Sequence, residues 1–189
     1  MQPVTLFEHL IWRGHYDGDL TSLKERIEIL FDTSNKLNTG LERDGGVSSS
    51  SDPNAPHTWR EIGPFLNWLI EPSSQIWQHW QFPEAALRVK ASWANCHPTG
   101  AWTDEHQHRS VPMVVVLYVD QPECGGNLEI ADPMFYHWNY SEKSTDNTWR
   151  EVPIQSGDVL IFPGWINHRT QKNASYNNRY VISFNIGPG

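Results

Sequence analysis

Three histidines and one arginine in the second half of the chain are the residues whose types and spacing could do chemistry. His106 and His108 lie two positions apart in the run Asp104–His108. On a β-strand, residues two apart project from the same face with α-carbons about 6–7 Å apart, so two imidazoles can converge on one metal ion. On a helix the same pair would diverge. A third ligand must come from elsewhere, and His168, sixty residues after His108, is the natural candidate.

Two close ligands and a distant histidine are typical of non-haem Fe(II) sites. The usual set is two histidines and one carboxylate, with open positions for substrate and O₂. Here the second close ligand is His108, or Asp104 or Glu105 supplies a carboxylate. The competing interpretation is a pair of solvated histidines, with Arg179 in a surface salt bridge. The joint occurrence of His168 and Arg179, eleven positions apart on either side of a loop, favours the metal site.

The stretch that carries His168 and Arg179 predicts two strands around a turn. Asp158–Phe162 and Arg179–Ile186 have strand character, and Pro163-Gly164 is a turn, so we expect a hairpin-like unit. In the last strand, period-two alternation gives a polar face that would line a cavity, made of Arg179, Val181, Ser183 and Asn185. The alternate residues predict an apolar core face, made of Tyr180, Ile182, Phe184 and Ile186.

The remaining elements predict one domain, with a helical part over residues 1–85 and a β-rich part over residues 86–189. In the first part we expect an edge strand over 4–12, a helix over 19–36, a polar loop over 41–56 that could act as a lid, a helix over 58–70 that Pro72 ends, and one or two further helical turns over 73–80. In the second part we expect strands at about 86–95, 101–108, 111–120, 127–131, 134–139, 149–154, 158–163, 166–171 and 179–186. Short, regularly spaced strands favour a mostly β jelly roll with the helices packed outside one sheet.

Further positions complete a longer pattern over about residues 89–186. They are Trp93-Ala94-Asn95, His106-Gln107-His108, the aliphatic run Val114–Val119 with Tyr118, Gly125-Gly126 through Asp132-Pro133, Phe162 through His168, Arg179, Ser183 and Asn185. This order resembles the 2-oxoglutarate/Fe(II)-dependent dioxygenases, and most closely the 2OG-Fe(II) oxygenase group of marine bacteria and their phages. That group tends to carry a proline after the second histidine, whereas Arg109 follows here, so His108 and Asp104 both stay open as the second close ligand.

The resemblance implies a double-stranded β-helix, cupin-like in architecture, with Fe(II) as cofactor and 2-oxoglutarate and O₂ as cosubstrates. It implies that His106, His108 and His168 hold the iron. Arg179 would form a bidentate pair with the distal carboxylate of 2-oxoglutarate. Further cosubstrate contacts would come from Tyr118, Asn95 and Ser183. The substrate pocket would be shaped by Trp102, Trp138, Trp165 and Asn185, although packing is the competing role for the tryptophans.

The composition limits the partners of this chain. The net charge of −8 and a pI near 5.5 give no electrostatic case for binding nucleic acid. The sequence shows no signal peptide or membrane span, and its two cysteines make no disulfide framework, so we expect a soluble cytoplasmic protein. The substrate would be a small molecule or a protein side chain. The alternative is a cupin-like isomerase or sugar-binding module without 2-oxoglutarate, which would have no need of a cation at Arg179.

Overall fold

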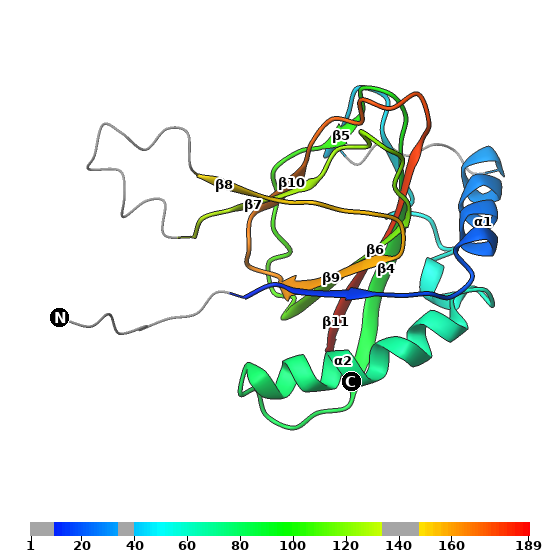
Figure 1. The fold of residues 1–189 in the computed structure, drawn as a ribbon. Coiled ribbons are helices and arrows are strands. Elements are labelled where there is room, and N and C mark those ends of the chain that lie inside the picture. The colour runs from blue at the N-terminus through cyan, green and yellow to red at the C-terminus, as the bar shows by residue number, and fades with distance from the viewer. Residues whose placement is uncertain (1–9, 34–39, 134–147) are drawn as a thin grey trace, which may run out of the picture.

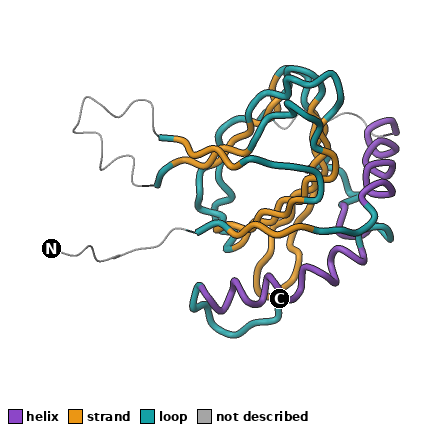
Figure 2. Tube along the Cα trace, in the orientation of Figure 1, coloured by secondary structure: helices purple, strands orange, loops and turns teal. Residues whose placement is uncertain are grey.

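The computed structural model describes residues 10–33, 40–133 and 148–189, and strands make up most of its regular structure (Figure 1). The helices are α1 (Leu20–Thr33), the short 3₁₀ helix η1 (Pro56–Thr58) and α2 (Gly63–His79). The strands are β1 (Trp12–His15), β2 (Glu42–Arg43), β3 (Val47–Ser48), β4 (Leu87–His97), β5 (Trp102–Thr103), β6 (Met113–Asp120), β7 (Leu128–Ala131), β8 (Trp149–Val152), β9 (Asp158–Pro163), β10 (His168–Thr170) and β11 (Arg179–Pro188). Figure 2 shows α1 to the right of the strands and α2 below them.

Two antiparallel sheets form the body of the fold. The large sheet has the strand order β1-β9-β6-β11-β4-β3, the small sheet has the order β10-β7-β8, and β2 pairs with β5. An apolar cluster takes residues from both main sheets, namely Val114, Val116, Tyr118, Leu128, Leu160, Phe162, Ile166 and Val181. From β4 onward the chain passes back and forth between the large sheet and the smaller ones, with β7 and β8 together in the small sheet, and the two layers share one interior. This arrangement is a double-stranded β-helix and confirms the predicted fold class.

A larger core fills the space between the large sheet and the two helices. It contains every residue of the predicted apolar face of β11, Tyr180, Ile182, Phe184 and Ile186. The buried residues of α1 recur at helical spacing, as Leu23, Ile27, Leu30 and Phe31. From α2, the ring of Phe65 lies 5.4 Å from that of Phe184. Burying each such side chain contributes about 1.5–3 kcal/mol, so this core fixes the helices on the outer face of the large sheet, as predicted.

The first helix begins where the sequence predicts. Asp19 caps it, because its carboxylate accepts hydrogen bonds from the backbone N–H of Ser22 at 3.0 Å and from the Ser22 hydroxyl. The second helix differs from the prediction. Pro72 lies inside α2, which continues to His79. The proline removes one backbone hydrogen-bond donor, but the buried residues beyond it, Ser73, Ile76 and Trp77, keep the helix against the sheet.

The predicted hairpin between residues 158–162 and 179–186 is wrong. β9 pairs with β1 and β6, whereas β11 pairs with β4 and β6, so β6 lies between the two strands. The chain between them crosses to the small sheet as β10, which pairs with β7. Residues 113–119 of β6 are all buried. A strand buried along most of its length takes the middle of a sheet, which is why β6 lies between β9 and β11.

The predicted strand over 101–108 is also shorter than expected. Only Trp102–Thr103 is a regular strand, and the histidine pair lies in the irregular segment that follows. This segment bonds to a different partner at each step, because β5 pairs with β2, His106 forms an isolated bridge with His168, and His108 bonds to Gly164. His106 and His108 lie two residues apart and their partners His168 and Gly164 lie four apart, so the pairing cannot continue as a regular ladder.

The polar segment 41–56 contains β2 and β3, which tie it to β5 and β4, so it is held against the sheets rather than looping freely. The N-terminal strand begins at Trp12 and pairs with β9. The rest of that expected strand before residue 10, the helix beyond Thr33, the expected strand 134–139 and Trp138 lie outside the described residues.

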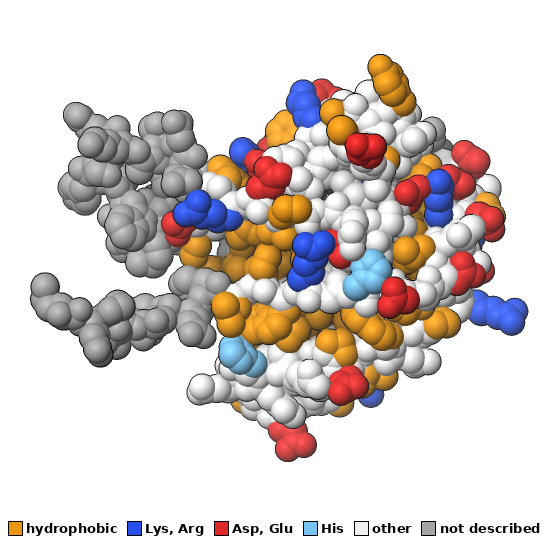
Figure 3. Space-filling view, viewed as in Figure 1, with side chains coloured by type: hydrophobic (Ala, Val, Ile, Leu, Met, Phe, Trp, Pro, Cys, Tyr) orange, Lys and Arg blue, Asp and Glu red, His pale blue; other side chains and the backbone are white. Residues whose placement is uncertain are grey.

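The surface carries charges of both signs. Figure 3 shows acidic and basic side chains scattered over one face, with a band of hydrophobic side chains across its middle. No helix in the described ranges combines the length and apolar character needed to cross a membrane.

Candidate metal centre

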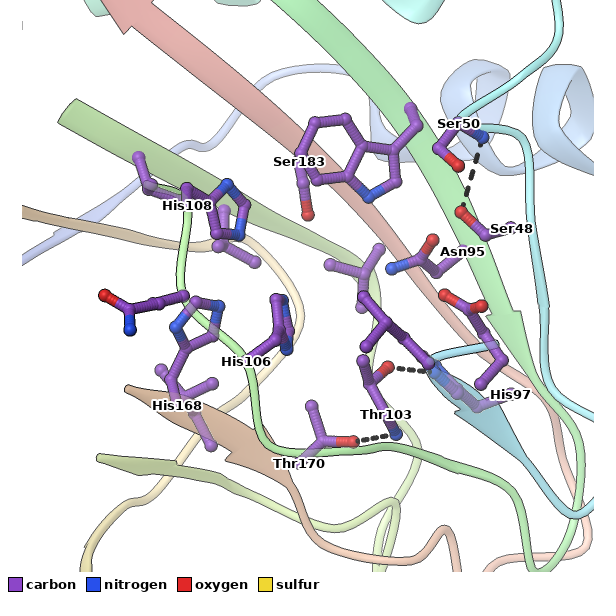
Figure 4. Close-up of a pocket in the computed structure, with 18 of the residues that line it drawn as sticks. Ser48, Ser50, Asn95, His97, Thr103, His106, His108, His168, Thr170 and Ser183 are labelled. Carbon is purple, nitrogen blue, oxygen red and sulfur yellow. Dashed lines mark hydrogen bonds between the residues drawn. The ribbon is translucent and has the colours of Figure 1, made fainter. Parts of the chain in front are cut away.

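Three imidazoles meet where the small sheet faces the large one. His106 and His168 exchange backbone hydrogen bonds of 3.0 and 2.9 Å, and the backbone N–H of His108 donates to the carbonyl of Gly164 at 2.8 Å. One nitrogen from each ring lies within 4.8 Å of one nitrogen of the other two. Figure 4 shows the three rings turned toward one another. The structure thus brings together all three histidines that the sequence predicted as metal ligands.

The hydrogen bonds of these rings indicate which nitrogen faces the centre. The Nδ1 atom of His106 is 2.8 Å from the carbonyl oxygen of Asp104, and that of His168 is 3.0 Å from the carbonyl oxygen of Ile166. The Nδ1 atom of His108 is 2.7 Å from Oδ1 of Asn185. An oxygen acceptor at Nδ1 requires the proton there, so each ring presents the lone pair of Nε2. Three imidazoles oriented in this way form a ready donor set for a metal ion.

Burial keeps these imidazoles neutral. It lowers the pKa of His106, lowers that of His108 to about 4, and places that of His168 well below the ordinary histidine value. The neighbouring histidines lower the pKa values of His108 and His168 further. A metal ligand must be deprotonated, so no proton has to leave before an ion binds at neutral pH. Imidazole suits Fe, Zn, Cu and Ni, and the site therefore fits an iron ion on donor chemistry alone.

Asp104 is not brought into this cluster. Its Oδ2 atom pairs with Arg43 at 2.7 Å, and its Oδ1 atom accepts the backbone N–H of Glu105 at 2.9 Å. Glu105 is exposed and accepts a hydrogen bond of 3.1 Å from Asn167. Neither carboxylate belongs to the group of converging ligand atoms that the described residues form.

A cavity of about 260 Å³ opens beside the three imidazoles. Ligand sites for drug-sized molecules run from about 300 Å³ upward, so this one suits small ligands. Of the predicted polar face of β11, Val181 and Ser183 line the cavity as expected, whereas Arg179 and Asn185 are not among its lining residues. In the sheet, Val181 lies between Asn95 and Tyr118, which also line the cavity. Asn95 is buried, and its Oδ1 atom has no hydrogen-bond partner within the described part of the chain.

Arg179 lies behind the cavity wall and is fully buried. Its hydrogen-bond partners are neutral: three backbone carbonyls, the ring of His97 and the hydroxyl of Thr170. Burial lowers the pKa of Arg179 to about 10, and the nearby Tyr118 raises it, so the guanidinium stays protonated at neutral pH. A buried cation with neutral partners favours the binding of an anion nearby.

The residues expected to shape a substrate pocket are dispersed. Asn185 hydrogen-bonds to His108 and so holds a ring of the metal centre. Trp165 is 48% exposed and lines a second groove rather than the main cavity. Gln107 lines both the groove and the cavity. The side chain of Trp102 donates a hydrogen bond to the carboxylate of Asp44.

Sequence reasoning assigned no role to seven polar residues that line the cavity, which are Glu42, Ser48, Ser50, His97, Thr103, Gln107 and Thr170. His97 could have been found, because it continues the alternation of Trp93 and Asn95 along β4, but the predicted strand ended at residue 95. Thr170 shares the face of His168 two residues along β10. Glu42 gave no signal, because it belongs to a two-residue strand in a segment that the sequence marked as a loop.

Comparisons with known proteins give one family match and a set of structures with a similar fold. A family model described as "Putative 2OG-Fe(II) oxygenase" matches residues 91–185, just over half of the chain. No curated protein sequence matches the chain.

Solved structures with the same fold are distant in sequence. A prolyl-4-hydroxylase from Pseudomonas putida is 15% identical with a TM-score of 0.63, and the alignment covers 94% of this chain and 92% of that one. HygX from Streptomyces hygroscopicus was solved with nickel, 2-oxoglutarate and hygromycin B bound. It is 15% identical with a TM-score of 0.62, and the alignment covers 95% of this chain and 82% of HygX. The epimerase SnoN from nogalamycin biosynthesis is 11% identical with a TM-score of 0.64, and the alignment covers 95% of this chain and 77% of SnoN. These likenesses show the fold.

Proposed function

The chain belongs to the 2OG-Fe(II) oxygenase family, whose enzymes use Fe(II), 2-oxoglutarate and O₂, and on that premise we propose that it hydroxylates an organic substrate. Bound Fe(II) would supply the activation of O₂ and the oxidative decarboxylation of 2-oxoglutarate. In the overall reaction one oxygen atom enters a substrate C–H bond as a hydroxyl group. The other oxygen atom enters succinate, and CO₂ leaves. Membership of this family sets aside the cupin-like alternative without 2-oxoglutarate.

The convergence of three neutral imidazoles, one buried and two half-buried, beside a small cavity carries this proposal. His106, His108 and His168 would hold the iron through Nε2, since the Nδ1 atom of each faces an oxygen acceptor. The set contains no carboxylate, so the bound ion would keep its full charge of 2+. An anionic chelating cosubstrate would compensate that charge within the cavity.

The rest of the cavity would orient the cosubstrate and keep water away from it. Arg179 would supply the positive charge for the distal carboxylate of 2-oxoglutarate. Tyr118 and Ser183 line the cavity from neighbouring strands and could donate their hydroxyls. Asn95, with an unpartnered buried oxygen, could contact the cosubstrate. Asn185 would act indirectly, because it fixes the ring of His108.

The substrate class is a small molecule or a protein side chain. HygX was solved with the small molecule hygromycin B, and another structure of this fold is a prolyl-4-hydroxylase. The cavity is small, and the groove that contains Trp165 and Trp149 adjoins it through Gln107. We infer that the substrate reaches the iron from this groove, with its reacting C–H bond alone inside the cavity.

Succinate formation tests the proposed reaction. Purified protein with Fe(II), ascorbate and 2-oxoglutarate should release succinate slowly, and a screen of small molecules and peptides under ¹⁸O₂ should find a substrate that gains one labelled oxygen. His168→Ala should lose both products. His57→Ala is the matched control, because His57 bonds to Ser92 outside the cluster. Succinate formation with a stereochemically inverted but unoxygenated substrate would contradict hydroxylation.

A further inference from the structure

The second groove, of about 340 Å³, is tied to the metal centre through the backbone. Three of its lining residues are sequence neighbours of the histidines, because Glu105 and Gln107 flank His106 and Asn167 precedes His168. The backbone bridge between His106 and His168 therefore also fixes the groove. On the groove side, the amide of Asn167 donates to Oε1 of Glu105 at 3.1 Å. A ligand held in this groove would have a fixed position relative to an ion bound by the three imidazoles.

The charged side chains that line the second groove are acidic. Glu105 and Asp132 belong to the lining, and among the described residues no lysine, arginine or histidine does. Glu105 is exposed, and its carboxylate forms no ion pair within the described ranges. Main-chain hydrogen bonds hold Asp132 in place, since its own N–H donates to Thr148 at 2.7 Å and that of Ala131 donates to Asn167 at 2.9 Å. Two carboxylates without a cation of their own in the lining attract a positively charged ligand.

Two indoles supply the apolar surface of the same groove. Trp165 is exposed and Trp149 is half-buried. The guanidinium of Arg169 lies over the Trp149 ring, 4.1 Å from its centroid, so this indole already packs against one cation. Arg169 does not neutralise the groove, because its Nε atom pairs with Glu129 at 2.6 Å. Indole rings combined with carboxylates favour the binding of organic cations.

The metal centre does not oppose a cation beside it once the cosubstrate is bound. The three imidazoles are neutral, because burial lowers their pKa values. A divalent ion held by them keeps its charge of 2+, and the two carboxylates of 2-oxoglutarate bring the sum to zero. The carboxylates of the groove then dominate the local electrostatics.

We propose that the substrate is an organic cation, with an ammonium or guanidinium group that Glu105, Asp132 and the two indoles hold in the second groove while a C–H bond of the same molecule reaches the metal. This inference rests on the proposed function and deepens it, because it names the charge class of the substrate. A small amine and a basic side chain of a polypeptide share this chemistry.

Ligand-observed NMR titration of the full chain loaded with Ni(II) and 2-oxoglutarate measures the charge preference. The cationic probes are Nα-acetyl-lysine methylamide and Nα-acetyl-arginine methylamide, and the norleucine counterpart is the neutral match. At least one cationic probe should bind about tenfold more tightly than the neutral probe, from two exposed ion pairs and one cation–π contact. The preference should shrink between about 0.05 and 0.5 M salt, because exposed charges are screened.

A fourth probe, n-butylamine, separates the two sources of the cation. Equal affinities of n-butylamine and the lysine derivative indicate a small amine as substrate. Tighter binding of the lysine derivative indicates a polypeptide side chain, because only this probe carries the flanking peptide groups.

Substitutions test whether the groove causes the preference. Glu105→Gln should reduce it about threefold, and Glu105→Gln with Asp132→Asn should remove it. Glutamine can still accept the hydrogen bond from Asn167, so the loop geometry is kept. Glu25→Gln is the matched control and should keep the full preference, because Glu25 is exposed on α1, on the opposite side of the molecule from β7 and β8 (Figure 1).

Equal affinity for cationic and neutral probes, including no detectable binding of either, would overturn the inference. A full preference in the double variant would overturn it as well. Succinate formation by a chain that shows no preference for cations would refute this inference alone. A cation-selective chain that never forms succinate would contradict the proposed function instead.

Discussion

Replacing Asn185 with alanine should weaken metal binding without contacting the metal. The carboxamide oxygen of Asn185 lies 2.7 Å from Nδ1 of His108 and fixes the orientation of that ring. Loss of a net hydrogen bond costs about 0.5–1.5 kcal/mol, and an unsatisfied buried donor costs about 1–3 kcal/mol. His108 is only half-buried, so water can replace part of the lost contact. We therefore expect a loss of about 1.5 kcal/mol, or roughly tenfold in affinity, at the lower end of the range for such partners.

The companion variant Asn185→Asp should bind metal at least as tightly as the wild type. A carboxylate is a stronger acceptor for Nδ1–H and raises the basicity of the ligating nitrogen. Competition between the protein and a chromophoric chelator for Co(II) at neutral pH measures both variants. Asn178→Ala is the control, because its amide also makes one hydrogen bond, to the hydroxyl of Tyr180, away from the cluster. Wild-type affinity in Asn185→Ala, or weaker binding in Asn185→Asp than in Asn185→Ala, would refute this role.

Two further outcomes follow from backbone packing and from burial. Gly164→Ala should lower both the thermal midpoint and the metal affinity, because the added Cβ atom would overlap the carbonyl oxygen of Val111 and approach that of His108 to 2.7 Å. Differential scanning fluorimetry and the Co(II) competition assay measure the two effects. A wild-type result in both would contradict this packing role. Burial, and to a lesser extent the charge of Arg179, lowers the pKa of His97 in the folded protein. The unfolded chain therefore binds a proton at His97 at a higher pH than the folded protein does. The metal-free protein should lose stability as the pH falls below about 6.5. Urea unfolding at about pH 7.5 and 5.5 should show a smaller pH effect in His97→Gln than in the wild type, and an equal effect would contradict this cause.

Local periodicity predicted the parts of the site that lie on one strand. Alternation along residues 179–186 separated the core face from the cavity face correctly, because a strand's side-chain period does not depend on its partners. Residue type and spacing left His108, Asp104 and Glu105 as alternatives for the second close ligand, and the resemblance implied all three histidines. The structure brings His106, His108 and His168 together. His106 and His108 converge because each bonds to a different neighbour, His168 and Gly164, and not because they share a regular strand.

The rest of the site depends on packing between distant segments. Nothing in the local pattern places β6 between β9 and β11, because turn and period signals do not name a strand's partner. The contacts that join Arg179 to His97 and Thr170 bridge positions 82 and 9 residues apart, and they exist only once β4, β10 and β11 have assembled. Pro72 shows the same limit, because burial of the following turn outweighs the signal to stop the helix.

Anaerobic titration with Fe(II) in the presence of 2-oxoglutarate tests the central claim most directly. A keto acid chelated to iron gives a charge-transfer band in the visible range, provided that the protein leaves open positions on the metal. The wild type and His57→Ala should develop this band to saturation at one iron per chain, and His168→Ala should not develop it. A band of undiminished intensity in His168→Ala, or wild-type protein that binds iron without any band, would contradict a cosubstrate site built on His106, His108 and His168.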